Sequence, residues 1–121
     1  MALPAKLQNE IRQYQRLQQD LTQISQQRMQ IDLKLRETTH TLEELKSVAD
    51  EAVIYRPIGG LMVKAQNKKE VVDLLTDEKE TLEVRVKALE RNENQLKERY
   101  TTMTKELSDA LQAAGVTAAP Q

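Results

Sequence analysis

Few side chains in this chain of 121 residues could do chemistry. It has no Cys, which excludes thiol catalysis, disulfides and cysteine-based zinc sites. Its single His, His40, lacks a second imidazole for a catalytic or metal-binding pair. The adjacent carboxylates at 43–44 and 77–78 are expected on solvated helix faces, because nothing in the pattern brings them into one cleft. The glycine pair at 59–60 is not followed by the Lys-Ser/Thr of a phosphate loop. We therefore expect no enzyme, no cofactor and no bound metal.

Charge is abundant but balanced, with 18 Lys and Arg against 19 Asp and Glu and a net charge of −1. A chain this neutral has no general attraction for nucleic acid or an anionic membrane, and the basic step at 68–69 is too short for a nucleic-acid patch. No apolar run could span a membrane and no signal-peptide pattern opens the chain, so we expect a cytoplasmic protein. With 31% charged and 2% aromatic residues, the composition is typical of long solvated helices.

Proline and glycine divide the chain into three parts. They cluster around residues 57–60, whereas the stretches 5–56 and 61–114 contain neither. Such long uninterrupted stretches are typical of long helices. The pattern predicts one unit spanning 1–121, with a helix at about 5–50, a β-hairpin at about 51–66, a second helix at about 67–114 and a flexible tail at 115–121.

Both long stretches keep the three-and-four apolar spacing of a coiled-coil seam. In the first stretch the seam positions are Leu7, Glu10, Tyr14, Leu17, Leu21, Ile24, Arg28, Ile31, Leu35, Thr38, Leu42, Leu45 and Ala49. In the second they are Val72, Leu75, Lys79, Leu82, Val86, Leu89, Glu93, Leu96, Tyr100, Met103, Leu107, Ala110 and Ala114. Asn67 with Glu70 resembles a capping box, and Gly115 is placed to end the second helix. Neither helix can bury its seam alone, so we expect the two to pack antiparallel.

The position of the bend sets the register between the two helices. Tyr14 then lies opposite Met103, and Leu35 lies opposite Leu82. Four layers contain a misfit: Arg28 with Leu89, Ile24 with Glu93, Thr38 with Lys79, and Glu10 with Leu107. Because Arg28 and Glu93 fall in neighbouring layers, our hypothesis is that they pair and fix the register at some cost in stability.

The segment between the helices has a different composition. Two apolar runs, Val53-Ile54-Tyr55 and Leu61-Met62-Val63, flank a connection that contains Pro57, Gly59 and Gly60. This pattern predicts a β-hairpin in which the glycines supply the positive φ of the turn. Both faces of the hairpin would be apolar and both edges open, so we expect hairpins from several subunits to bury one another. The alternative is that the hairpin only caps its own coiled coil.

This arrangement resembles the beta class of prefoldin subunits. The likeness covers roughly residues 5–113, and its specific part is the hairpin, which reads Val-Ile-Tyr-Arg-Pro-Ile-Gly-Gly-Leu-Met-Val-Lys over 53–64. The Gln-rich start of the first helix and the opening of the second at 79–91 resemble the same family, with an archaeal character. The alpha class carries two hairpins, whereas this chain has room for one.

The resemblance implies a mainly α fold in which the hairpins assemble into an inter-subunit β-barrel. It implies a hexamer of two alpha-class and four beta-class subunits whose coiled coils extend from that platform. Their far ends would hold unfolded polypeptides without ATP and deliver them to a group II chaperonin. By position, the platform would be built by Val53, Ile54, Tyr55, Ile58, Leu61, Met62 and Val63.

The client-binding tips would then lie at the helix ends remote from the hairpin. Seam packing is poor there, since Leu107 meets Glu10, so we expect the helices to fray and expose apolar side chains. The candidates are Leu3, Leu7, Ile11, Tyr14, Met103, Leu107, Leu111 and Val116. Ordinary coiled-coil packing is the alternative role for those on the seam. For the whole chain, the rival interpretations are a scaffolding coiled coil without clients and a small nucleic-acid-binding regulator, which the charge balance disfavours.

Overall fold

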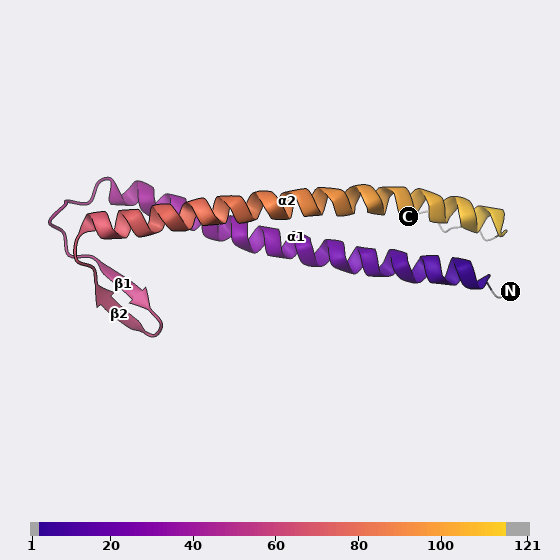
Figure 1. Ribbon diagram of the computed structural model, residues 1–121, viewed down its shortest axis with the longest axis horizontal. Helices are drawn as coiled ribbons and strands as arrows, with labels where there is room; N and C mark the ends of the chain where they lie inside the picture. Colours follow the sequence, from indigo (N-terminus) through magenta and orange to yellow (C-terminus); the bar gives the residue numbers. More distant parts are fainter. Residues whose placement is uncertain (1–2, 116–121) are drawn as a thin grey trace. The chain divides into compact units, whose positions relative to one another are not determined.

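The computed structural model describes residues 3–115, and the expected tail from 116, with Val116, lies outside them. In chain order the elements are helix α1 (Ala5–Leu45), strands β1 (Tyr55–Ile58) and β2 (Leu61–Lys64), and helix α2 (Lys68–Ala113) (Figure 1). The chain forms two compact units. One contains residues 1–28 and 88–121, and the other contains residues 29–87. The mainly α class with one hairpin between two antiparallel helices is confirmed.

In the unit that contains both chain ends, α1 and α2 pack through mixed aromatic and polar layers. The rings of Tyr14 and Tyr100 stack with centroids 5.0 Å apart. The Tyr14 hydroxyl also lies 3.0 Å from the Oγ1 atom of Thr104. Tyr14 therefore sits between Tyr100 and Thr104, which agrees with the predicted position opposite Met103. Leu7 and Leu17 are buried in the same unit.

The unit that contains the hairpin has its own small apolar core. Leu45, at the end of α1, packs with Ala65 and with Val71 near the start of α2. Around these three lie the half-buried side chains Val48, Ile54, Val72 and Leu75. Higher along the helices, Lys34 and Glu78 approach to 3.6 Å. This contact is one layer from the predicted pairing of Leu35 with Leu82.

Helix α1 ends at Leu45, five residues before the end expected from the sequence. From there the chain continues in short turns, in which the N–H groups of Lys46, Ser47 and Val48 each bond to the carbonyl three residues earlier. Val48 packs against the core of this unit, and its carbonyl accepts a 2.8 Å hydrogen bond from the Lys68 ammonium. The first helix thus ends where tertiary contacts replace helical ones, without a Pro or Gly.

Helix α2 has the predicted signals at both ends. The Glu70 N–H donates to the Asn67 side chain at 2.8 Å, as in a capping box. The Glu70 carboxylate returns a bond to the Gln66 N–H, one residue before the usual partner. At the other end Gly115 has a φ of 79°, and its N–H donates to the Gln112 carbonyl. This left-handed residue ends the helix as expected.

The hairpin has a two-residue turn. Ile58 pairs with Leu61, which leaves Gly59 and Gly60 as the turn residues. Gly59 alone has a positive φ, of 60°, so only one of the two glycines takes the conformation expected of both. A positive φ at the first turn residue alone is the pattern of a type II′ turn, which suits the twist of a hairpin.

Candidate functional site

The hairpin presents apolar side chains on both of its faces. Since cross-strand partners share a face, Ile58, Leu61 and Val63 lie on one side, and Tyr55 and Met62 lie on the other. Their exposed fractions run from 41% for Val63 to 70% for Leu61. An isolated two-stranded hairpin is marginally stable in water, and this one exposes most of its apolar surface. The hairpin is therefore suited to bury itself against other chains.

One edge of the hairpin is better suited than the other to accept a further strand. The Ala65 N–H bonds to the Ile54 carbonyl at 2.8 Å, and bonded pairs alternate along an antiparallel ladder. Pro57 and Met62 therefore form a pair whose backbone groups point outward. Because Pro57 has no N–H, the outer edge of β1 lacks a donor that the outer edge of β2 retains.

Two predicted hairpin residues lie in other surroundings. Ile54 comes before β1, is half-buried and packs against the core formed by Leu45, Ala65 and Val71. Val53 also precedes β1 and is 59% exposed. Ile54 therefore anchors the hairpin to its own helices, whereas Val53 remains available for contact with other chains.

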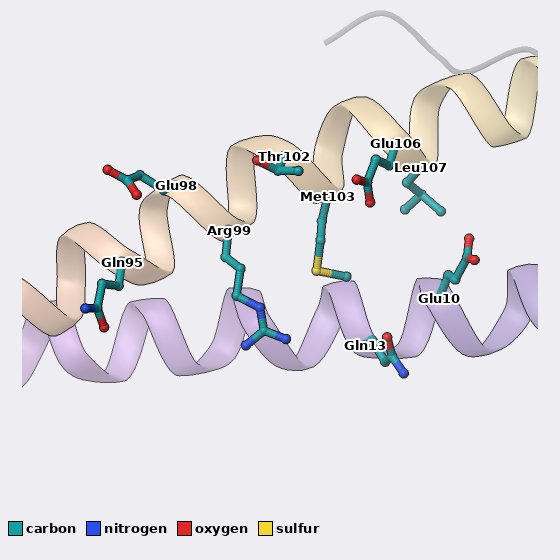
Figure 2. Close-up of a pocket in the computed structure, with 9 residues that line it drawn as sticks. All are labelled: Glu10, Gln13, Gln95, Glu98, Arg99, Thr102, Met103, Glu106 and Leu107. Atoms are coloured by element: carbon teal, nitrogen blue, oxygen red, sulfur yellow. The ribbon is translucent and has the colours of Figure 1, made fainter.

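In the unit that contains both chain ends, α1 and α2 form a groove of about 650 Å³. Met103 extends from α2 toward α1, and Leu107 lies beside it, facing Glu10 (Figure 2). The remaining lining residues are polar, namely Gln13 from α1 and Gln95, Glu98, Arg99, Thr102 and Glu106 from α2.

The groove coincides with one of the misfit layers of the seam. An ionised carboxylate resists removal from water, so Glu10 cannot fill the space against Leu107 as a Leu would. Both side chains are accordingly only half-buried. The seam thus opens at this layer and leaves the side chains of Met103 and Leu107 partly accessible from the groove.

The structure brings only some of the candidate tip residues to this groove. Met103 and Leu107 line it, whereas Leu7 is only 6% exposed and is buried in its unit. The other candidates are half-buried and lie outside the lining: Leu3, Ile11, Tyr14 and Leu111. Both helices are regular to Ala5 and Ala113, so the expected fraying is not seen. The polar lining residues were not among the candidates, although Glu10 was noted as a misfit.

A buried carboxylate lies further along the same unit. Glu93 is 4% exposed and accepts hydrogen bonds from Ser25 at 2.5 Å and from the Arg28 Nε atom at 2.8 Å. The predicted pairing of Arg28 with Glu93 is confirmed. The Ser25 bond lowers the pKa of Glu93 most; burial opposes this, and Arg28 and Lys97 lower it further. Glu93 is thus held ionised within an otherwise apolar seam.

Replacing Glu93 with Ala should lower the free energy of unfolding by about 1–3 kcal/mol, because Ser25 and Arg28 lose a charged acceptor. Since folding lowers the pKa of Glu93, its stabilisation is complete above the unfolded value near 4.5 and is lost as the pH falls through the folded value. Denaturant unfolding across pH should show the two proteins converging in acid. Glu90→Ala, an exposed neighbour, is the control, and an equal effect there would contradict the role of Glu93.

A protein-family model described as prefoldin subunit matches residues 8–114. The chain belongs to the prefoldin family. The prefoldin subunit beta of Archaeoglobus fulgidus is 41% identical over 109 residues, which cover 90% of this chain and 93% of that protein. The prefoldin subunit beta of Methanosarcina acetivorans is 40% identical over 112 residues, or 93% and 92% of the two chains. The resemblance to the beta class of prefoldin is confirmed.

Solved prefoldin structures share the fold. The crystal structure of the prefoldin beta subunit from Thermococcus strain KS-1 matches with a TM-score of 0.79 and 37% identity. The match covers 91% of this prefoldin chain and 96% of that one. The beta2 subunit from the same strain matches with a TM-score of 0.69 at 24% identity over 77% of this chain and 98% of its own, a likeness of fold alone.

Two searches of residues 3–115 gave no candidates. In this range no three His, Cys, Asp or Glu side chains are placed to hold a metal ion. Neither α1 nor α2 contains a segment apolar and long enough to cross a membrane.

Proposed function

We propose that this prefoldin subunit is a non-catalytic, ATP-independent chaperone component in the cytoplasm. It assembles with an alpha-class subunit through its hairpin, holds unfolded polypeptides near the free ends of its helices and delivers them to a group II chaperonin. The observation that carries the proposal is the hairpin itself, whose apolar side chains are exposed on both faces. Family membership supports the chaperone role.

Assembly through the hairpin follows from its surface. Five apolar side chains on β1 and β2 are 41–70% exposed. Burying one such side chain is worth about 1.5–3 kcal/mol, so neighbouring hairpins gain substantially by packing together. The open edge of β2 offers a place for strand pairing, and closure into a barrel would leave no edge exposed.

Client holding follows from the groove that Met103 and Leu107 line. A Met-containing surface adapts to side chains of different shapes. One shallow groove binds weakly, but several subunits in one assembly give higher overall affinity while each contact stays reversible. The candidates Leu3, Leu7, Ile11, Tyr14 and Leu111 would extend this surface when the helix ends open.

Removing residues 1–12 and 106–121 should abolish the suppression of client aggregation while leaving assembly intact. The deletion takes away Leu107 and Glu10 but does not touch the hairpin unit. Light scattering of a denatured client measures holding, and native mass spectrometry with an alpha-class subunit measures assembly.

The matched control is the full-length chain mixed with the same alpha-class subunit. Undiminished holding by the truncated protein would show that clients bind elsewhere. If the full-length assembly also fails to slow aggregation, the chain acts as a scaffolding coiled coil, the alternative to a chaperone. Salt-sensitive binding to DNA or RNA would instead favour the regulator.

A further inference from the structure

The groove in the unit with both chain ends has an acidic end. Glu10 from α1 and Glu106 from α2 project toward the same opening, beside Leu107 (Figure 2). Glu98 lines the groove further along α2. Among the described residues that line the groove, Arg99 is the one cation, and its side chain extends toward α1 at a distance from Leu107. The apolar surface of the groove is therefore bordered by negative charge on one side.

These carboxylates are not used within the chain. No ion pair or side-chain hydrogen bond between described residues involves the side chains of Glu10 or Glu106. Other exposed carboxylates are paired, such as Glu43 with Lys46 at 2.9 Å and Glu44 with His40 at 3.1 Å. The acidic end of the groove thus keeps its full capacity for a cation supplied by another molecule.

We infer that the groove selects unfolded segments in which an apolar side chain lies next to Lys or Arg. The apolar side chain occupies the space beside Met103 and Leu107, and the neighbouring cation lies between the carboxylates of Glu10 and Glu106. Charge complementarity argues for this occupant, because an acidic segment would place like charges together. The inference rests on the proposed client-holding function and adds the class of sequence that is held.

The size of the preference follows from the exposure of the groove. Exposed ion pairs contribute about 0.2–1 kcal/mol each, so two of them should favour a basic peptide over a neutral one about threefold to tenfold. The preference should decline with added salt, since the Debye length falls to about 3 Å at 1 M. The apolar contribution to binding should persist in salt.

The test uses the full chain assembled with an alpha-class subunit and three fluorescent Gly/Ser-based peptides. Each peptide carries Leu-Leu, flanked by Lys, by Gln or by Glu. Fluorescence anisotropy should rank the affinities Lys, then Gln, then Glu at low salt, and the ranking should collapse at high salt. The paired variant Glu10→Gln with Glu106→Gln should reduce the ratio of Lys-peptide to Gln-peptide affinity to near one.

The matched control removes the same charge elsewhere, through Glu37→Gln with Glu90→Gln, and should keep the wild-type ratio. These two carboxylates are exposed and lie outside the groove. Equal binding of the three peptides to the wild type would overturn the inference while leaving client holding in place. Failure to bind any of the three would contradict the proposed function itself. A salt-independent preference would show that the carboxylates do not cause it.

Discussion

Replacing Leu61 and Met62 together with Lys should abolish assembly and leave the subunit folded. The two side chains are 70% and 65% exposed and lie on opposite faces of the hairpin, so the change affects both surfaces. Losing the burial of two such side chains costs about 3–6 kcal/mol per subunit, which is a factor of roughly 10²–10⁴ in the association constant. Native mass spectrometry and sedimentation, with and without an alpha-class subunit, would measure the loss.

The control for this variant is already present on the helices. Leu33 and Val84 are 58% and 68% exposed, so Leu33→Lys with Val84→Lys makes the same chemical change at matched exposure. Assembly of this control should resemble that of the wild type. The helical circular dichroism of both variants should be unchanged, because none of the four side chains belongs to the core around Leu45. Normal assembly of the hairpin variant would remove the basis of the proposed function.

The hairpin was predictable from sequence because its signals are local. Two apolar runs around Gly59-Gly60 leave few other conformations for so short a segment, and the observed register follows from a two-residue turn. The end of α1 was not predictable to the same degree. Residues 46–50 contain no Pro or Gly, and the helix stops there because Val48 and Lys68, distant in sequence, contact each other. Such a stop is visible only once the tertiary fold is known.

The candidate site was predictable in part for the same reason. Heptad spacing identified Met103 and Leu107 as facing α1, and identified Glu10 as a residue that does not fit the seam. It also brought Arg28 near Glu93, whose contact the structure confirms. The polar lining from Gln95 to Glu106 lies off the seam, so its place in the groove depends on how far individual side chains extend from α2. Periodicity carries no information of that kind.

Replacing Glu10 with Leu should stabilise the unit that contains both chain ends and at the same time reduce client holding. The new side chain can pack against Leu107, and burying a side chain of this size is worth about 1.5–3 kcal/mol. Filling the layer also closes the groove beside Met103. Thermal unfolding should shift to a higher temperature, while the rate of client aggregation in the presence of the assembly should rise toward that of the client alone.

Opposite changes in stability and holding separate this explanation from its competitors. A misfolded variant would lose both, so a rise in the melting temperature excludes that reading of reduced holding. Asn9→Leu adds the same side chain at an exposed position beside Glu10 and should change neither property. If Glu10→Leu instead improved holding, the total apolar surface near the helix ends would matter more than the groove. The misfit at Glu10 would then be a defect in the seam, whereas the groove proposal makes it the feature that keeps Met103 and Leu107 accessible to clients.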